Sequence, residues 1–193
     1  EREGNVTIVQ TAPTVTYEIL KSDGEIIQIT NPAELPDPSQ VKEIREPLVQ
    51  VEIITPKDSI GEIMKLCGQR RGIYRKQQFL SETRQILDYD IPLAEIIYDF
   101  YDKLKSMTSG YGTMDYQLKG FQSENLVKMD ILVNGTPVDA LSVIVHREKA
   151  EQRGRLLLVK LKKQIDRHLF EIPLQAAIGG KIIARETIKS VGK

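Results

Sequence analysis

Several residue types that mark particular protein classes are scarce or missing in this chain of 193 residues. Its single cysteine, Cys67, excludes a disulfide framework and any zinc site built from cysteines. No run of about 18 apolar residues occurs, which excludes a transmembrane helix. Hydrophobic residues make up 40% of the chain and charged residues 28%, which is ordinary for a soluble globular protein of one or two domains.

The start of the chain lacks two further features. Residue 1 is glutamate and not methionine, and no apolar signal-peptide segment follows it. We therefore expect this sequence to be part of a longer protein.

The common signatures of catalysis and metal binding are missing. Residues 179–181 contain the glycine–lysine pair of a phosphate-binding P-loop, but lack its earlier glycine and its following serine or threonine. His146 and His168 lie too far apart to share a helix face, and we expect each to cap or border a helix. We expect Cys67 to be a core residue. The sequence offers no catalytic residue and no metal site.

The formal net charge of zero hides an uneven distribution. Residues 147–193 contain 12 Lys or Arg against 5 Asp or Glu, whereas residues 1–146 contain 15 against 22. An excess of positive charge at one end predicts contact with a polyanion.

Residues 46–122 show an alternation of strand and helix patterns, read from the spacing of their apolar residues. Strands are expected over 49–53, 73–79, 87–91 and 114–118, and helices over 60–67 and 93–104. This order predicts a ferredoxin-like βαββαβ sandwich and hence the α+β class.

Two details of this unit are also predicted. Arg70 and Arg71 are expected to end the first helix, with cations near its negative end and Gly72 just past the last turn. Asp88 and Asp90 alternate along a strand, and an exposed sheet face is a more common setting for such a pair than a metal site.

A small α+β unit is predicted over residues 123–193, with one basic amphipathic helix and a hairpin. Strands are expected over 127–133 and 138–145, the helix over 149–165, and the hairpin over 170–178 and 181–189. Asn134 and Gly135 indicate a type I′ turn. Pro173 predicts that its strand lies at a sheet edge, or that its missing N–H points away from a partner. Short strands within residues 1–30 and a proline-rich linker over 31–45 complete the prediction.

The predicted basic helix separates its apolar and cationic residues. At 100° per residue, its cations fall within about 80° of arc, and its apolar residues fall on a separate arc. The cations are Lys149, Arg153, Lys160, Lys163 and Arg167, and the apolar residues are Ala150, Leu157, Leu158, Leu161 and Ile165. Lys181, Arg185 and Lys189 are spaced by four, which predicts one face of a strand. We interpret these eight cations as a surface for phosphate backbones; a solvated helix face is the alternative.

Several sequence runs resemble known translation factors. Residues 46–47, 55–56, 61, 70–72, 92–95 and 106–112 resemble the fifth domain of elongation factor G and its translational GTPase relatives. Residues 133–142, 145–147 and 175–187 look like the C-terminal domain of the LepA family, also called elongation factor 4, and residues 11–15 and 31–38 look like its third domain and linker.

The resemblance implies a domain order and a function. Residues 1–30 would be the last strands of a third domain, 31–45 a linker, 46–122 the domain like the fifth of elongation factor G, and 123–193 the C-terminal domain without its lysine-rich tail. The whole protein would be a ribosome-dependent GTPase that back-translocates tRNAs or remodels stalled ribosomes. It would be a cytoplasmic monomer, and the resemblance further implies a peripheral position at the inner face of the cell membrane.

The same resemblance implies the partners of this part of the protein. They would be tRNA and the large ribosomal subunit, with Arg70, Arg71, Arg75 and Lys76 as weaker candidates for contact with ribosomal RNA. GTP and Mg²⁺ would bind in a G domain outside this sequence, so no cofactor is expected here.

Other functions stay open at this point. The chain could be the C-terminal part of another translational GTPase, or a module that contacts ribosomal proteins through an exposed edge around Pro173. A small enzyme on a ferredoxin-like core would require a deep pocket with converging polar groups.

The proposed phosphate contacts predict a steep salt dependence. If about five phosphates of duplex-like RNA are neutralised, the slope of log affinity against log salt is about −4, and affinity falls several-hundred-fold between about 50 and 200 mM salt. Titration of tRNA at several salt concentrations measures this slope; a flat response would contradict the interpretation.

Overall fold

The computed structural model describes residues 14–165 and 171–191. By its internal contacts the chain divides into two compact units. The first contains the described residues up to Glu18 together with Arg45–Ser123, and the second contains Ile19–Ile44 together with the residues from Glu124 onward.

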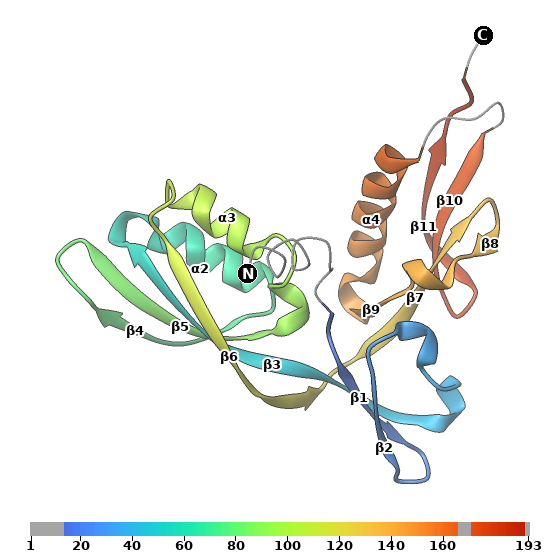
Figure 1. Ribbon diagram of the computed structural model, residues 1–193, viewed down its shortest axis with the longest axis horizontal. Helices are drawn as coiled ribbons and strands as arrows, with labels where there is room; N and C mark the ends of the chain where they lie inside the picture. Colours follow the sequence, from blue (N-terminus) through green and yellow to red (C-terminus); the bar gives the residue numbers. More distant parts are fainter. Residues whose placement is uncertain (1–13, 166–170, 192–193) are drawn as a thin grey trace, which may run out of the picture. The chain divides into compact units, whose positions relative to one another are not determined.

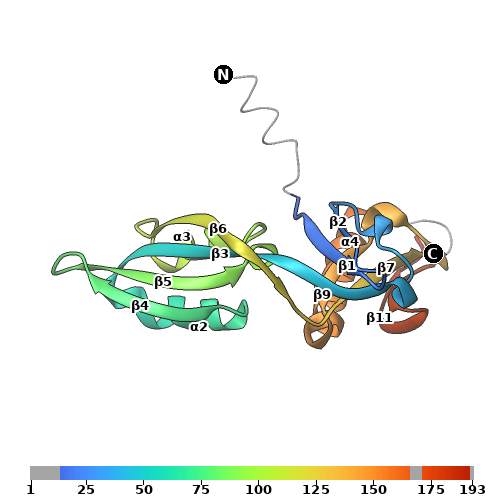
Figure 2. The same ribbon diagram turned by 90° about the horizontal axis from the view of Figure 1, so that it is seen from below.

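The first unit is built on four antiparallel strands and two helices. In chain order these are β3 (Val41–Pro56), α2 (Ile60–Gln69), β4 (Ile73–Phe79), β5 (Arg84–Pro92), α3 (Phe100–Met107) and β6 (Thr113–Ser123). The strands lie side by side in the order β6-β3-β5-β4 (Figure 2), and both helices cover one face of this sheet (Figure 1). This is the ferredoxin-like order, so the predicted α+β class is confirmed.

The core of the first unit lies between the sheet and the helices. Val49, Val51 and Ile53 point into it from β3, as their alternation predicted. Cys67 is fully buried on the core side of α2. Burial raises the pKa of its thiol to about 12, so the group stays protonated and unreactive at neutral pH. The prediction that Cys67 is a core residue is confirmed.

The second helix of this unit differs from the sequence prediction. A single helix was expected over 93–104, but a 3-10 turn, η4 (Leu93–Glu95), is followed by irregular backbone, and α3 begins only at Phe100. Glu95, at the end of this turn, is buried, and its carboxylate accepts a hydrogen bond from Arg71.

Helix α2 ends at Gln69, with Arg70, Arg71 and Gly72 directly after it, as predicted. The N–H of Gly72 donates to the carbonyl of Cys67 at 2.8 Å, which closes a Schellman motif. The left-handed residue in this motif is Arg71, with φ of 59°, and not Gly72. Gly72 is needed for another reason, since a Cβ there would lie 2.7 Å from the carbonyl oxygen of Cys67.

The second unit includes two short strands and two 3-10 turns before residue 45. Strands β1 (Tyr17–Lys21), which begins in the first unit, and β2 (Ile26–Ile29) continue the sheet in the order β2-β1-β3. The proline-rich segment forms η1 (Pro32–Glu34) and η2 (Pro38–Gln40). The side chains of Asn31 and Asp37 cap these turns by accepting backbone N–H groups, so this segment has a defined structure.

A second sheet and one helix form the rest of this unit. The elements are β7 (Leu126–Val133), β8 (Thr136–Pro137), β9 (Val143–His146), α4 (Ala150–Gln164), β10 (Ile172–Ile178) and β11 (Lys181–Ile188). The strand order is β11-β10-β7-β8, and β9 also pairs with β7. Positive φ angles of 54° at Asn134 and 83° at Gly135 confirm the predicted type I′ turn. The strand expected over 138–145 is interrupted by the 3-10 turn η5 (Asp139–Leu141).

Pro173 does not mark a sheet edge, because β10 lies between β11 and β7. The pairing with β7 begins at Leu174, so the missing N–H of Pro173 falls outside it. The carbonyl of Pro173 still accepts the N–H of Asn134 at 2.9 Å. The predicted edge position is therefore wrong. Since the N–H and C=O positions of one residue in an antiparallel strand point to the same side, the nitrogen of Pro173 faces Asn134, just past the end of the β7 ladder.

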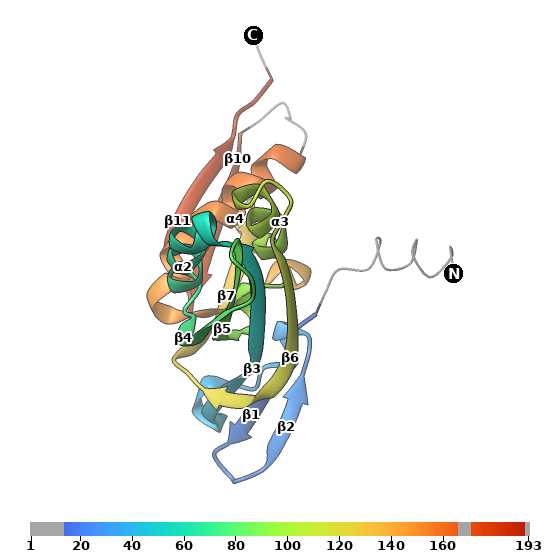
Figure 3. The same ribbon diagram turned by 90° about the vertical axis from the view of Figure 1, so that its left-hand side faces the viewer.

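Small residues let α4 approach the second sheet closely, and α4 runs beside β10 and β11 (Figures 1 and 3). A Cβ added at Gly154 would lie 3.1 Å from the Cβ of Ala176, 3.2 Å from the Sδ of Met129 and 3.6 Å from the Cβ of Ala184. A Cβ at this point would therefore require the helix or the sheet to give by a few tenths of an ångström, and a longer side chain would require more.

This contact predicts different effects of one substitution at two helical glycines. Gly154→Leu should destabilise the second unit by about 2 kcal/mol or more through overpacking. Gly61→Leu in α2 should change stability by less than about 0.5 kcal/mol, because nothing lies within 4 Å of a Cβ there. Urea unfolding followed by circular dichroism measures both; equal losses would contradict the close approach.

Candidate nucleic-acid interface

The apolar face of α4 is anchored to the second sheet. Ala150, Gly154 and Leu158 are buried along one line of the helix. Leu157, Leu161 and Ile165 pack at the margin of the same core. The predicted apolar arc is thus confirmed. Gly154 also belongs to it, although the sequence prediction did not include this residue.

The predicted cations of the helix differ in exposure. Lys160 and Lys163 are exposed and form no ion pair within the described residues, and we call them the helix lysines. Lys149 and Arg153 are half-buried. Arg167 lies outside the described residues.

The other two cations of α4 are paired with acids. Arg155 contacts Glu151 at 2.7 Å, and Lys162 reaches Glu186 of β11 at 3.1 Å. The backbone N–H of Thr187 and the charge of Lys162 lower the pKa of Glu186. The charges of Arg155 and Lys162 are therefore already matched by acids of the same unit.

His146 borders the start of α4, as predicted. Its Nδ1 accepts the backbone N–H of Glu148 at 3.2 Å, and its Nε2 lies 3.3 Å from Oε1 of Glu124. This caps the 3-10 turn η6 (Arg147–Lys149), which leads into the helix. Arg147 is exposed here and was missed by the sequence argument, because it lies before the helical pattern begins. His168 lies outside the described residues.

The hairpin cations do not share one face, which corrects the sequence prediction. Lys181 pairs with Ile178, and Arg185 pairs with Gln175, three positions away. A β-bulge between Ala176 and Ala177 places one extra residue on β11, so the alternation of side chains is reversed across it. Arg185 and Lys189 keep a common face, and Lys181 lies on the other.

The sheet also separates the helix lysines from two of the hairpin cations. Ala184 and Glu186 of β11 face α4, since one packs against Gly154 and the other binds Lys162. Arg185 alternates with them and therefore faces away from the helix. The structure does not bring the eight predicted cations onto one surface.

In the first unit, the side chain of Arg71 forms ion pairs within a buried cluster. It contacts Glu46 at 2.7 Å and Glu95 at 2.9 Å, and both of these side chains are almost fully buried. Burial opposes its charge, but the hydrogen bonds that Arg71 donates to Glu46 and Glu95 outweigh this and raise the pKa of the guanidinium. Arg70 is also held internally, by the carbonyl of Glu95 and the carboxylate of Asp99.

Arg75 and Lys76 lie above two carboxylates of β5. Arg75 contacts Asp90 at 2.6 Å, and Lys119 of β6 reaches the same oxygen at 2.5 Å. Lys76 lies 3.9 Å from Asp88. Both aspartates are buried beneath these cations, which corrects the expectation that they are exposed. Burial opposes the charge of Asp90, but Lys119 and Arg75 together lower its pKa.

Lys119 was not among the residues predicted from the sequence, since only the fold brings side chains of β6 and β4 to the same carboxylate.

Among residues 14–165 and 171–191, no three His, Cys, Asp or Glu side chains are grouped so as to hold a metal ion. Within the same residues, no helix is both long and apolar enough to cross a membrane.

Two family models match this chain. The model for the elongation factor G C-terminus matches residues 43–132, and the model for the GTP-binding protein LepA C-terminus matches residues 133–193. The ferredoxin-like unit and the α4 unit are thus C-terminal domains of the translational elongation factor class.

The relatives identify the family within this class. The chain is 53% identical to elongation factor 4 of Agathobacter rectalis, and 52% identical to those of Clostridioides difficile and Clostridium tetani, over all 193 residues. It spans 32% of the length of each. The chain belongs to the LepA, or elongation factor 4, family, which confirms the resemblance.

A solved structure from Thermus thermophilus aligns with 42% of this chain and 12% of its own, at 18% identity and a TM-score of 0.39. This likeness is too low to support a conclusion on the fold.

The Arg71 cluster predicts a large stability effect for one arginine and a small one for another. Arg71→Met leaves two buried carboxylates without their cation and should cost about 3 kcal/mol. Arg75→Met should cost less than about 1 kcal/mol, because Arg75 is half exposed and Lys119 still pairs with Asp90. All seven tyrosines lie between residues 17 and 116, so tyrosine fluorescence during urea unfolding reports on the first unit. Similar losses for both variants would contradict the structural role of Arg71.

Proposed function

We propose that this chain is the RNA-contacting C-terminal part of a translation factor, and that it binds helical RNA by charge and shape without chemistry of its own. The observation that supports this most directly is the pair of helix lysines. They are exposed on a rigidly anchored helix, while the neighbouring cations Arg155 and Lys162 are already paired with acids.

The helix lysines, which form no ion pair within residues 14–165 and 171–191, suit the phosphate backbone. An exposed cation with no internal partner can neutralise a phosphate and release counterions without first breaking an ion pair. The helix lysines are three residues apart, which is less than one turn of helix, and Lys149 and Arg153 lie toward the start of the helix on the same predicted arc. Arg185 and Lys189 face the other side of the sheet and would contact a second RNA segment. Arg75, Lys76 and Lys119 could add phosphate contacts in the first unit, whereas Arg70 and Arg71 serve internal ion pairs.

For the whole protein, we propose the activity that the family name implies. Its partners would be the ribosome and tRNA, and its action the back-translocation of tRNA or the remodelling of stalled ribosomes. GTP and Mg²⁺ would bind in a domain outside this chain. We also propose that the protein is a cytoplasmic monomer, with membrane association as a separate expectation.

The alternative of a protein-interaction edge around Pro173 loses its structural basis, because β10 is paired on both sides. An enzyme on the ferredoxin-like core gains no support, since the two hollows of the first unit are shallow and mainly apolar and have Asp115 as their one charged lining residue.

Charge reversal of the helix lysines tests the RNA proposal. Lys160→Glu with Lys163→Glu should weaken tRNA binding at least about tenfold and reduce the salt slope by about two. Lys57→Glu with Lys65→Glu makes the same change of charge on exposed residues of the first unit and should alter affinity far less.

Circular dichroism must show that both double variants stay folded. Unchanged tRNA binding by the helix variant would refute the assignment. Equal weakening by both variants would mean that net charge, and not the α4 surface, determines binding.

A further inference from the structure

The face of the first sheet that lies opposite to α2 and α3, which we call the outer face, contains a fully buried carboxylate. Tyr89 and Ile91 of β5 belong to the core between the sheet and the helices. Asp90 alternates with them and therefore points to the outer face. Its side chain is nevertheless 0% exposed. Burial of an ionised carboxylate is costly unless cations and hydrogen bonds compensate it.

Two β-bulges bring a cation to Asp90 from each side of β5. On β4 the residue without a partner on β5 is Arg75, and on β6 the residue without a partner on β3 is Lys119. Because β3 lies between β6 and β5, the side chain of Lys119 crosses a whole strand to reach Asp90. Bulges often redirect a side chain beside a functional site, and here two of them serve one carboxylate.

Both cations bind the same oxygen of Asp90. The Nε of Arg75 lies 2.6 Å from Oδ2 and the Nζ of Lys119 lies 2.5 Å from it, so these two nitrogens are within about 5 Å of each other. Oδ1 is buried, and no hydrogen bond reaches it from the residues that the structure describes. Neutralising Asp90 alone would favour one cation on each oxygen. The observed arrangement instead brings two cations together around one negative charge.

Each cation keeps donors for a further ligand. Arg75 binds Asp90 through Nε, and its Nη1 and Nη2 donate to no group within residues 14–165 and 171–191. The ammonium of Lys119 has three N–H groups, of which one is used on Asp90. The two side chains are 50% and 45% exposed, so solvent reaches both. We call Arg75 and Lys119, joined through Asp90, the β5 cation pair.

The neighbouring cations of the first unit lack this arrangement. Lys76 forms a single pair with Asp88 at 3.9 Å, which leaves no surplus of positive charge. Arg71 donates through Nε, Nη1 and Nη2 to buried carboxylates, so its guanidinium has no free edge. Arg75 is therefore the arginine of this unit whose two Nη groups stay available beside a second cation.

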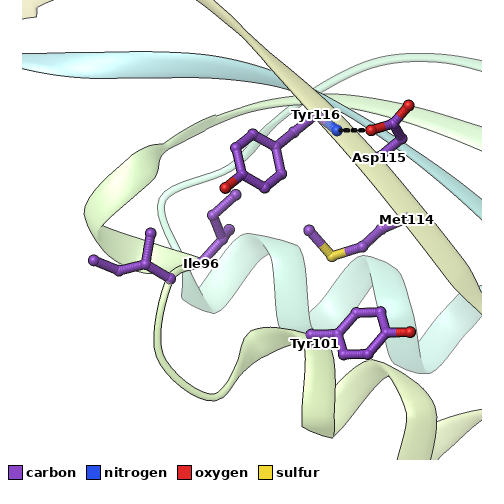
Figure 4. A pocket seen from close by; sticks show the side chains of 6 residues that line it. Ile96, Tyr101, Met114, Asp115 and Tyr116 are labelled. Carbon is purple, nitrogen blue, oxygen red and sulfur yellow. Dashed lines mark hydrogen bonds between the residues drawn. The ribbon is translucent and has the colours of Figure 1, made fainter. Parts of the chain in front are cut away.

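The surroundings of the pair limit where an anion binds. Residues 46–122 contain 10 Lys or Arg against 11 Asp or Glu, so this unit does not attract RNA by its overall charge. Met114 and Tyr116 point to the helix side of β6 (Figure 4), and Asp115 between them lies on the outer face, opposite Glu52 of β3. These two acids repel phosphates. An RNA strand would thus contact this face at the cation pair and not across it.

We propose that the β5 cation pair binds one phosphate group of an RNA backbone. The Nη groups of Arg75 donate to two phosphate oxygens, and the Nζ of Lys119 donates from the side of β6. Donor–oxygen distances to a phosphate are about 2.7–2.9 Å, so one phosphate bridges cations that lie this close. The inference rests on the proposed RNA binding and deepens it, because it assigns the contact of the first unit to two named side chains.

An exchange of arginine for lysine tests the guanidinium without changing the charge. The probe is a twelve-base-pair RNA duplex, added to the ¹⁵N-labelled chain of 193 residues. The Nε–Hε resonance of Arg75 and the amide resonance of Lys119 should shift. Arg75→Lys should weaken the affinity measured at Lys119 about fivefold or more, because lysine cannot donate bidentately. Arg84→Lys, the same exchange at an exposed arginine of β5, should change it less than about twofold.

A second variant tests the lysine of the pair. Lys119→Gln should weaken the affinity measured at the Arg75 Nε–Hε resonance about threefold or more, since it removes one of the two charges. Lys65→Gln, at an exposed lysine of α2 on the other side of the sheet, should change it far less. Circular dichroism must show that all four variants stay folded.

Three results would overturn the proposal. One is an RNA titration that shifts resonances of α4 but not those of Arg75 and Lys119; RNA binding by the second unit would then stand without this contact. Another is equal affinity for the Arg75→Lys and Arg84→Lys variants. The third is a shift of the same resonances by an octaglutamate peptide and not by RNA, which would make the pair a site for a protein carboxylate. A duplex that shifts no resonance of either unit would refute the proposed function as well.

Discussion

The first unit depends on one buried arginine. Arg71 joins the start of the sheet, the end of α2 and the turn before α3, because its guanidinium binds both Glu46 and Glu95. To reach them it adopts left-handed backbone geometry, which costs an ordinary residue about 1 kcal/mol. The two charged hydrogen bonds offset that cost, and removing the arginine would leave two carboxylates buried without a cation.

The same arginine holds the turn before α3. Its second partner, Glu95, is the last residue of η4, and α3 begins only at Phe100. Arg70 adds to this connection, because it donates to the carbonyl of Glu95 and to the carboxylate of Asp99.

Local patterns predicted the elements that depend on local chemistry. The Asn134–Gly135 turn follows from two residues that tolerate positive φ, and α4 follows from the spacing of its apolar residues. The exposure of Lys160 and Lys163 could be derived from the same helical geometry. The ion pair at the interruption before α3 could not be predicted, because Glu95 and Arg71 are 24 positions apart.

The hairpin cations Lys181, Arg185 and Lys189 likewise could not be placed from local patterns alone. A spacing of four predicts one face only if the alternation is unbroken, and sequence spacing does not reveal a bulge. The burial of Asp88 and Asp90 beneath Arg75 and Lys119 likewise depends on pairing between strands. RNA contact by any of these cations stays a prediction.

The bulge in β11 links the number of residues in the hairpin to the distribution of its charge. The residue of β11 that has no partner on β10 places Lys181 on the side of the hairpin opposite to Arg185. A relative with one residue more on β10, opposite the bulge, would restore unbroken alternation along β11 and bring Lys181 to the side of Arg185 and Lys189, so an insertion could redistribute charge without changing any cation.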